Sequence, residues 1–544
     1  MTAPQDRVAA TIAGELSAAA EQCPDDIAVC CDTGQRTFSE YRRDVWQAAA
    51  ALAACGLQPG DRVALWLPNT LDGATALLGV MVAGGTAVTL NTRYRAQEVA
   101  GILRRARCRL VIADGAFLGR NYAAEAAEVA GGIPVWCVGA GAPGGTRSWA
   151  QALAAGTGQE QELARRAAAA SGDDIAVVQY TSGTTGQPKG AALRQGPMLA
   201  TSAAWADIVG LRRGDVYPVT YPIAHVGGYK TGLLATLIAR ATTVLIPVIT
   251  TETLAAAIRA HPPTVLNGPP PVLRSVLSAL HDGLLPATTR IRTAVTGSAI
   301  VPPQLIRDLA RDLGAADVIN AFGSTEASGA CTMTRRGDPV ELVCETVGAA
   351  IPGVEVRIAP AADLVGAGSP DPESPDLQRP ARVGEIEVRG GSVMAGYLDD
   401  PLATAAALHD GWLRTGDIGW IGPDQYLRIV GRAKEMLVVG GFNVFPAEVE
   451  HVLADHPGVA EAAVVGIPDE RLGEVPVAFV VPAATAAGPG GPDLDELIAW
   501  CRDRLANFKV PRRIWAAGSL PRVTAGKVAK PELRRQAIAL AGRG

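Results

Sequence analysis

The amino-acid sequence predicts an α/β protein with a large N-terminal domain of two stacked α/β sublayers and a smaller C-terminal α+β domain. Strand-like and helix-like segments alternate from Glu40 to Val138, and a second series of strands begins at Asp215. After Gly353, short alternating strands predict a small β-rich subdomain. Beyond Gly431 lies a compact α/β piece of about a hundred residues, which is the size of a domain.

The first series has the segment lengths of βαβ units. It predicts helices over residues 44–56, 71–85 and 97–108, and strands over residues 62–68, 86–91 and 109–114. Strands separated by helices of this length pair in parallel. The second series predicts strands over residues 216–222, 242–248, 263–268, 291–297 and 317–323. Each series therefore forms one sublayer.

The β-rich subdomain is predicted from strands over residues 354–359, 384–390, 411–421 and 426–432. Pro360 to Val383 is rich in Pro, Asp and Gly, which predicts a surface loop. A second loop is expected over residues 482–493. We place the main boundary near Arg432, which gives domains of residues 1–431 and 432–544.

Composition excludes several classes of protein. With 544 residues, 19% charged and 48% hydrophobic, the chain suits a soluble globular enzyme, and a net charge of −5 gives no footprint for nucleic acid. The nine cysteines form no Cys-x-x-Cys pair, which favours a reducing cytoplasm. Charged residues interrupt the N-terminus, so no signal peptide is expected. The longest uncharged run, between Asp72 and Arg93, is split by Gly84 and Gly85, so we expect no integral membrane protein; a homodimer stays open.

A glycine pattern at residues 139–144 imitates a dinucleotide-binding motif. Gly139, Gly141 and Gly144 follow a strand-like segment with the spacing Gly-x-Gly-x-x-Gly. Pro143 and Gly145 would spoil the helix that must open there. A loop is therefore predicted, and a nicotinamide or flavin site is disfavoured.

The segment Tyr180 to Gly190 predicts a phosphate-binding loop. It follows the apolar run 175–178 and combines glycines, hydroxyl side chains and Lys189. Glycines allow close backbone approach, and hydroxyls, N–H groups and a lysine can surround phosphate oxygens. Pro188 precedes the lysine and Gly190 follows it, so this is not a Walker-type loop. The alternative is a flexible surface loop.

This segment resembles the phosphate loop of the adenylate-forming enzymes, which include acyl-CoA synthetases, adenylation domains of peptide synthetases and firefly luciferase. Six further clusters follow in the order of that family: PIAHVGG (222–228), GSAIVP (297–302), NAFGSTE (320–326), WLRTGDIG (412–419), GRAKEMLVVGGFNVFPAEVE (431–450) and LPRVTAGKVAK (520–530). The resemblance covers roughly residues 20 to 540. It implies ATP, Mg²⁺ and coenzyme A as cofactors, and a C-terminal domain that is mobile.

The resemblance also implies roles for particular residues. It assigns catalysis to Lys189, His225, Glu326 and Lys527, Mg²⁺ binding to Thr184 and Glu326, a hinge to Lys434, and the acyl pocket to Ala224, His225, Gly227, Gly228 and Tyr229. It assigns nucleotide and coenzyme A binding to Thr181, Ser182, Gly183, Thr184, Thr185, Gly186, Lys189, Gly297, Ser298, Ala299, Asn320, Ala321, Phe322, Gly323, Ser324, Thr325, Asp417, Arg432, Gly440, Gly441, Phe442 and Lys527.

The side chains suit these roles. The Phe322 ring can stack on adenine, although the family usually has tyrosine there, and Glu326 offers the hard oxygens that Mg²⁺ prefers. Asp417, predicted at the end of an exposed strand, can accept hydrogen bonds from both ribose hydroxyls. Taken singly, each cluster has a plainer alternative: a turn at Asp417, a core histidine at His225, a solvated lysine at Lys527. Glu435 replaces the commoner aspartate.

We therefore predict an acyl-CoA ligase that adenylates a carboxylic acid with ATP and transfers the acyl group to coenzyme A. Finer similarity, in NTRY (91–94), GGFNVFPAEVE and NFKVPR (507–512), is to actinobacterial CoA ligases for steroid-derived and fatty acids. Because Ala224 stands where an aromatic residue is common, and Gly227 and Gly228 add no bulk, we expect a bulky hydrophobic acid. The alternative substrate is an ordinary fatty acid. The alternative functions are an enzyme that performs only one half-reaction, an enzyme that loads a carrier protein, and a non-catalytic binding protein.

Overall fold

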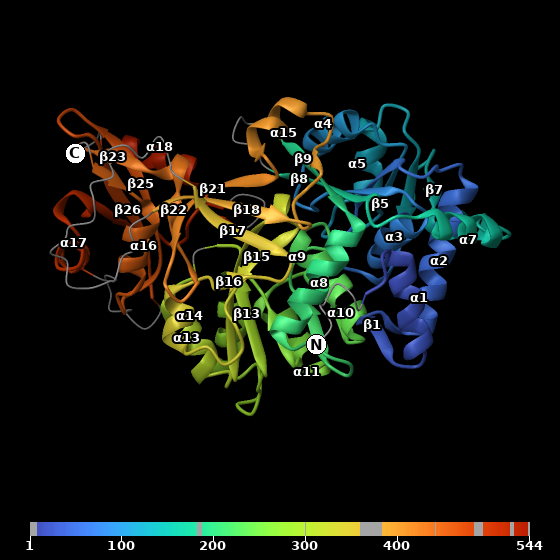
Figure 1. Ribbon diagram of the computed structural model, residues 1–544, viewed down its shortest axis with the longest axis horizontal. Coiled ribbons are helices and arrows are strands. Elements are labelled where there is room, and N and C mark those ends of the chain that lie inside the picture. The colour runs from blue at the N-terminus through green and yellow to red at the C-terminus, as the bar shows by residue number, and fades with distance from the viewer. Residues whose placement is uncertain are drawn as a thin grey trace.

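The computed structural model of the protein describes residues 8–181, 188–299, 301–359, 383–440, 442–483, 493–522 and 527–541. These residues confirm the predicted α/β class, because they form two large and two small sheets flanked by helices. N-terminal elements, in blue, lie at one end of the long axis, and the elements of residues 437–541, in dark orange and red, lie at the other (Figure 1).

Eight of the described strands form the sheet built by the first series. In spatial order they are β19 (Gly396–Tyr397), β9 (Lys189–Arg194), β8 (Ile175–Thr181), β4 (Thr86–Thr89), β3 (Arg62–Trp66), β5 (Leu110–Asp114), β6 (Val135–Val138) and β7 (Arg147–Ser148). The strands from β8 to β6 are parallel, as the βαβ pattern predicts. β9 runs antiparallel to β8, so the predicted phosphate loop connects these two strands.

Nine described strands form the second large sheet. In spatial order they are β16 (Ala349–Ala350), β15 (Gly329–Met333), β14 (Asp317–Ser324), β13 (Thr293–Gly297), β12 (Val265–Asn267), β10 (Val216–Val219), β11 (Thr242–Leu245), β1 (Ile27–Cys31) and β2 (Gly34–Thr37). The strands from β14 to β1 are parallel. All five strands predicted in the second series are present here.

Helices fill the space between the two large sheets and cover their outer faces (Figure 1). One continuous apolar core joins both sheets to α1 (Ile12–Gln22), α2 (Phe38–Ala54), α3 (Leu71–Val82), α8 (Gln195–Val209) and α10 (Ala235–Ala239). A second core packs α11 (Thr251–Ala260), α12 (Pro270–His281), α13 (Pro303–Arg311) and α14 (Val340–Glu345) on the nine-stranded sheet. A third packs α4 (Ala96–Ala106) and α5 (Tyr122–Val129) on the eight-stranded sheet. This is the predicted pair of stacked sublayers.

The two small sheets follow the second sublayer in the chain. The first contains β17 (Val354–Ala359), β18 (Gly384–Gly390), β21 (Trp412–Ile421), β20 (Leu408–His409) and β22 (Leu427–Arg432). The second contains β24 (Phe442–Val444), β23 (Leu437–Val439), β26 (Gly473–Pro482), β25 (Val459–Asp469) and β27 (Ile514–Ala516), covered by α16 (Pro446–Ala454), α17 (Leu494–Arg502) and α18 (Lys530–Ala541). The change of sheet falls between Arg432 and Leu437, across the short turn η5 (Ala433–Glu435).

Local chemistry sets the ends of several elements. α2 begins six residues before the predicted helix because Thr37 and Glu40 form a reciprocal capping box. α8 ends where Gly210 takes a left-handed conformation. The segment 139–144 opens no helix, which confirms the predicted loop; the next helix is α6 (Trp149–Ala154), followed by α7 (Glu160–Ala169). No helix in the described ranges has both the length and the apolar character needed to cross a bilayer.

Candidate active site

The predicted site residues lie where strands of the two large sheets end. Thr181 ends β8, Gly297 ends β13, and Thr325 and Glu326 follow β14 in the turn η3 (Thr325–Ala327). In α/β sheets, ligands bind beyond the carboxyl ends of parallel strands, where loops and backbone groups converge. Residues distant in the sequence are thus brought to one edge of both sheets.

The Glu326 carboxylate is held by two hydroxyl groups. Its Oε1 accepts hydrogen bonds from the Thr181 hydroxyl at 3.2 Å and from the Tyr397 hydroxyl at 3.1 Å. Within the described part of the chain, Oε2 has no hydrogen-bond partner. A carboxylate fixed on one oxygen and open on the other suits a hard cation that also binds phosphate oxygens.

Lys189 lies beside this carboxylate. It is the first residue of β9 and is paired in register with Thr181. Its Nζ lies 5.2 Å from the centre of the Tyr397 ring, a cation–π distance. Tyr397 therefore positions both the predicted metal ligand and the predicted phosphate-binding lysine.

A buried chain of hydrogen bonds fixes Thr325. The Gln179 amide donates to the Thr325 hydroxyl at 3.2 Å, and the Tyr229 hydroxyl donates to the Gln179 carbonyl oxygen at 3.1 Å. Tyr229 is 1% exposed, so it supports Thr325 from within the core.

The residues predicted to contact adenine lie on β13, on β14 and just after β13. A Cβ atom at Gly297 would overlap the Ala321 carbonyl oxygen, so only glycine allows these strands to approach so closely. Ser298 and Ala299 are exposed, and the Phe322 ring is half-buried. The Ser298 hydroxyl lies 3.2 Å from the Tyr221 hydroxyl.

Asn320 and Gly323 on β14 stabilise the packing of this strand against its neighbours. The Asn320 amide donates to the Thr346 carbonyl at 3.0 Å, which ties β14 to the segment after α14. A Cβ atom at Gly323 would overlap the Gly329 carbonyl oxygen across a bulge in the β14–β15 pair. Ser324 follows, and its hydroxyl oxygen is buried without a hydrogen-bond partner among the described residues.

Asp417 differs from its predicted environment. It lies within the ten-residue β21 and is 6% exposed, not at the end of an exposed strand. Its Oδ1 accepts from the Arg432 Nε at 2.9 Å, across the β21–β22 pair. Burial raises the pKa of Asp417, and the positive charges of Arg432 and Lys527 oppose that rise. The sequence missed the burial because β22 covers Asp417 from a later segment.

The structure brings Lys527 to the same place. Part of the side chain remains accessible to solvent, but the protein around it lowers its pKa. The largest cause is the loss of solvation around the ammonium group, and the positive charge of Arg432 lowers the pKa further. The negative charges of Asp417, Glu326 and Glu435 oppose this shift. Lys527 also contributes to lowering the pKa of His225. The C-terminal lysine therefore lies within electrostatic range of Asp417 in β21, Glu326 in η3 and His225 after β10.

An ion-pair network fixes the segment that carries Lys527. The Lys530 ammonium lies 2.6 Å from Glu435 and 2.8 Å from Glu450. Burial alone would lower the pKa of Lys530, but the charges of Glu450 and Glu435 raise it. Glu435 directly follows the predicted hinge, Lys434, which is exposed in η5. The network thus ties the start of α18 to the turn between the two small sheets.

His225 caps the short helix α9 (Val226–Gly228). Its Nδ1 accepts from the Gly227 N–H at 3.1 Å, so a neutral ring carries its proton on Nε2. Burial, with the Lys527 charge, lowers the pKa of His225 to about 4, so the ring is neutral at pH 7. Its face stacks on Tyr221, with ring centres 5.8 Å apart.

Gly227 and Gly228 do not leave the space that the sequence suggested. A Cβ atom at Gly227 would lie 2.7 Å from the Tyr221 ring, and one at Gly228 would overlap the Pro222 carbonyl oxygen. Both glycines are required by close backbone packing around the His225 turn. Their small size therefore does not by itself enlarge an acyl pocket.

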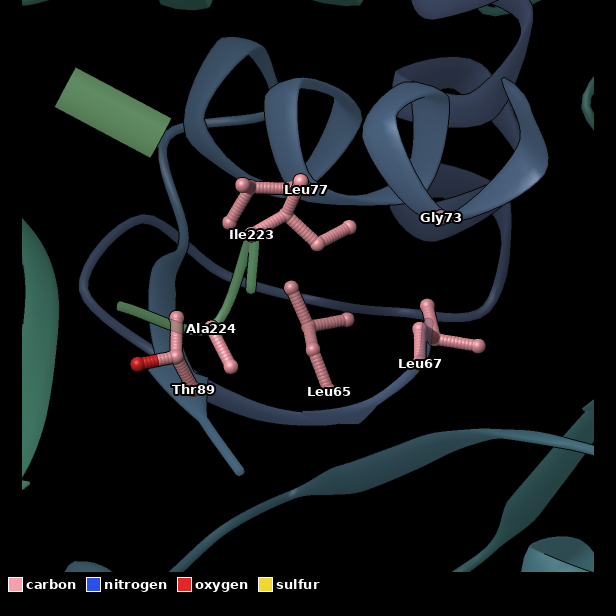
Figure 2. A pocket seen from close by; sticks show the side chains of 7 residues that line it. All are labelled: Leu65, Leu67, Gly73, Leu77, Thr89, Ile223 and Ala224. Carbon is pink, nitrogen blue, oxygen red and sulfur yellow. The ribbon is translucent and has the colours of Figure 1, made fainter. Parts of the chain in front are cut away.

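Ala224 does border a hollow. Figure 2 shows it among apolar side chains from β3, from α3 and from Ile223, with Thr89 at one side; the lining residues are Leu65, Leu67, Gly73, Leu77, Thr89, Ile223 and Ala224. The hollow encloses about 190 Å³, including its open mouth. Part of this volume is open solvent, so the hollow is a shallow apolar depression and not a pocket of the size that holds a drug-sized ligand.

The residues predicted to meet coenzyme A lie in the second small sheet. Gly440 takes a left-handed φ of 58°, and its N–H donates to the Leu472 carbonyl at 2.8 Å. Phe442 is 49% exposed and stacks on Phe508, with ring centres 4.7 Å apart. An exposed aromatic pair beside a glycine turn offers a flat apolar surface to a ligand.

Several predicted residues lie outside the described part of the chain: Ser182, Gly183, Thr184, Thr185, Gly186 and Gly441. Thr184, the second predicted metal ligand, is among them. In the described ranges no three His, Cys, Asp or Glu residues cluster to form a metal site. Glu326 remains as one carboxylate beside the phosphate loop, which fits Mg²⁺ bound through few protein ligands and substrate phosphates.

Four further residues lie in or next to the site that no sequence motif indicated: Gln179, Tyr221, Tyr397 and Lys230. Gln179 sits in an apolar strand, which is a weak signal for a support residue of Thr325. Tyr397 comes from the two-residue β19, whose antiparallel pairing with β9 has no local sequence signal. Lys230 interrupts an apolar helix, which is the strongest signal of the four.

Comparison with known proteins agrees with this geometry. The model of the AMP-binding enzyme family matches residues 16–398, and that of the AMP-binding enzyme C-terminal domain matches residues 448–527. The 3-(7a-methyl-1,5-dioxo-octahydro-1H-inden-4-yl)propanoyl:CoA ligase of Mycobacterium tuberculosis is 43% identical over 534 residues, 96% of this chain and 98% of the relative. The ligase of the same name from Rhodococcus jostii is 38% identical over 97% of this chain and 98% of its own.

Solved structures give the same result. ATP-bound MatB from Rhodopseudomonas palustris has a TM-score of 0.79 at 29% identity, over 97% of this chain and 99% of that one. A benzoate CoA ligase from Burkholderia xenovorans has a TM-score of 0.81 at 26% identity, over 96% and 99%. The predicted cofactors, ATP, Mg²⁺ and coenzyme A, are those that such ligases use. The chain therefore belongs to the AMP-binding enzyme family, as an ATP-dependent, AMP-forming acyl-CoA ligase.

Proposed function

We propose that this ligase activates a bulky, hydrophobic, fused-ring carboxylic acid that carries ring ketones. The support comes from the two relatives of 43% and 38% identity, whose names specify a dioxo-octahydroindene propanoyl group. The observation that carries the proposal is the acyl side of the site. Ile223 and Ala224, just before His225, line an apolar hollow, and beyond His225 the chain runs through Val226, Tyr229 and Leu233, all at least 95% buried.

In the first half-reaction, a carboxylate oxygen attacks the α-phosphorus of ATP, and pyrophosphate leaves. Two anions must approach each other, so the site needs positive charge. We assign Lys189 to the phosphates and Lys527 to the carboxylate and the α-phosphate. A charge pair at 4 Å contributes about 4 kcal/mol at an effective dielectric near 20. When bound, Mg²⁺ on Glu326 and Thr184 would neutralise phosphate charge.

The other predicted residues bind and orient. Thr325, held by Gln179, is assigned to the α-phosphate, and Asp417 with Arg432 to the ribose hydroxyls. Gly297 to Ala299 and Asn320 to Ser324 form the adenine side, with Phe322 supplying the ring face. The neutral His225 ring can donate a hydrogen bond from Nε2–H to the acyl carboxylate without adding a positive charge beside it.

In the second half-reaction, the coenzyme A thiol attacks the acyl carbon and AMP leaves. We assign the mobile unit to residues 432–544, turning about Lys434. This turn would remove Lys527 from the site and bring Gly440, Gly441 and Phe442 toward the thiol. The Lys530–Glu435 pair, at 2.6 Å, lies within this unit and would turn with it. We expect the enzyme to act in the cytoplasm and leave open whether it forms a homodimer.

The test is a substrate panel. Pyrophosphate release is measured with ATP, Mg²⁺ and acids of three kinds: fused-ring keto acids, linear fatty acids and aromatic acids. Thioester formation with coenzyme A follows. Highest kcat/KM for fused-ring acids is expected; a preference for linear or short acids contradicts the proposed substrate.

The same assay distinguishes two rival functions. A phosphopantetheinylated carrier protein replaces coenzyme A in one arm, and supplied acyl adenylate replaces acid and ATP in another. Acylation of the carrier alone would indicate a loading enzyme. Thioester formation from supplied adenylate alone would indicate an enzyme of one half-reaction.

A further inference from the structure

Lys230 is a buried amine that the reaction above does not use. It is 0% exposed, lies in the helical segment η2 (Tyr229–Leu234), and follows His225 by five residues. Its Nζ has no hydrogen-bond partner among the described residues, and no described carboxylate forms an ion pair with it. Buried polar groups in proteins are almost always hydrogen-bonded, so an unpartnered amine calls for an explanation.

The environment of the amine disfavours its charged form. Burial lowers the pKa of Lys230 to about 7, and Cys331 is the titratable group beside it. The Cys331 thiol lies 3.9 Å from the Gly329 carbonyl oxygen, and burial keeps its pKa high, so it supplies no negative charge. The amine is therefore suited to a neutral hydrogen-bond acceptor.

The amine lies between two segments that each follow a predicted site residue. Gly329 opens β15, three residues after Glu326, and a Cβ atom placed on it would lie 3.5 Å from Lys230 Nζ and 3.2 Å from Val226. Nζ thus lies between the helix that follows His225 and the strand that follows the Glu326 turn. An acid whose carboxylate binds between His225 and Glu326 would meet the two segments that hold Nζ.

The choice of lysine over arginine is itself unusual in this chain. Of 49 basic residues only six are lysines: Lys189, Lys230, Lys434, Lys509, Lys527 and Lys530. Arginine stays charged when buried, whereas a lysine amine can lose its proton and still donate a hydrogen bond. Although most basic residues of the chain are arginines, the basic residue with 0% exposure among the described ones is a lysine, Lys230.

We propose that Lys230 determines substrate specificity by donating a hydrogen bond from Nζ to a ring-ketone oxygen of the acid. This inference rests on the proposed function, because it needs a fused-ring acid bound beyond His225. A ketone accepts a hydrogen bond without bringing a charge into an apolar site. A second carboxylate in that position would need a charged lysine, which burial opposes.

The experiment compares matched substrates in the full-length enzyme. They are 3-(7a-methyl-1,5-dioxo-octahydroinden-4-yl)propanoic acid, its fully deoxygenated analogue, and a dicarboxylic acid on the same ring. Wild type is expected to prefer the dioxo acid by about tenfold or more in kcat/KM, since a site built to donate a hydrogen bond rejects ligands that cannot accept one. Lys230→Met should remove this preference, and Lys230→Gln, which keeps an N–H donor, should restore part of it.

The outcomes separate the inference from the proposed function. If wild type activates neither the dioxo acid nor its deoxygenated analogue, the proposed function and the role of Lys230 are both wrong. If wild type activates the dioxo acid and its deoxygenated analogue without discrimination, or if Lys230→Met lowers kcat/KM equally for these two acids while its Tm is not lowered, the proposed function holds and the role of Lys230 is wrong. A wild-type preference for the dicarboxylic acid would overturn the assignment of a ketone.

Discussion

The phosphate side and the acyl side of the active site differ in how their polar groups are satisfied. On the phosphate side, Glu326 accepts from two hydroxyls, Thr325 accepts from Gln179, and Asp417 pairs with Arg432. On the acyl side, Lys230 Nζ is fully buried with no partner in the described ranges. These phosphate-side groups are preorganised by the protein itself, whereas the acyl side leaves a donor for the ligand; the buried Ser324 hydroxyl on β14 is an exception, because it too has no partner among the described residues.

This difference follows from what each side binds. Every member of the reaction class handles the same nucleotide, so fixed protein contacts can hold its ligands in place before substrate arrives. The acid varies, and its recognition depends on a few groups placed in an apolar space. Changes on the phosphate side should therefore affect every acid alike, and changes on the acyl side should affect acids unequally.

The largest effect is expected for Lys527→Ala. Removing a preorganised charge typically lowers a rate by about a hundredfold or more, so pyrophosphate release should fall by this factor for every acid. Thioester formation from supplied acyl adenylate should change little. The matched control is Lys509→Ala in the same C-terminal region, where Lys509 pairs with Glu448 at 2.7 Å. Equal losses in both half-reactions would contradict the assignment of Lys527 to the first step.

Lys434→Pro tests whether η5 is the hinge. Proline fixes φ, and a hinge residue must change it, so the variant should retain one half-reaction and lose most of the other. Rates are measured for pyrophosphate release and for thioester formation from acyl adenylate. Wild-type rates in both assays would show that the turn occurs elsewhere. As with Lys527, the loss should not depend on the acid.

The sequence marks the phosphate side more clearly than the acyl side, for a physical reason. The phosphate loop, the Glu326 cluster and the strands before them are local patterns, in which residue type and spacing define the chemistry. The support residues Gln179 and Tyr397, and the burial of Asp417, arise from pairings between distant segments. At Gly227 and Gly228, the sequence alone cannot show whether a glycine allows close backbone packing or leaves space for a ligand. The domain boundary and the residue roles remain predictions.

Lys230→Met should raise stability, which no substitution on the phosphate side is expected to do. The folded protein holds this amine at a pKa of about 7, against an ordinary value of 10.5. Below pH 7 both states are protonated, and the folded state bears the whole penalty of a buried charge. Between pH 7 and 10.5 the unfolded state binds the extra proton, so wild-type stability rises with pH relative to the variant. The Tm advantage of Lys230→Met should be largest near pH 7 and shrink toward pH 9.5; a constant or negative difference would show that the amine has a partner.

The smallest effect, a change of several-fold, is expected for Ala224→Phe, and it tests the acyl side at its other end. The substitution places a ring beside Leu65 and Leu77, in a hollow of about 190 Å³. If one end of a fused-ring acid occupies this hollow, KM for that acid should rise, while a short linear acid should be little affected. Because cores seldom leave voids, a neighbouring side chain that already fills the space would make the two acids respond alike. Ala224→Val is the graded control, since it adds two methyl groups and should give an intermediate KM. If KM changes equally for the fused-ring acid and the short linear acid, the acyl group binds near His225 and Lys230 and not in the hollow at Ala224. The prediction of a large pocket from the small size of Ala224 would then be wrong.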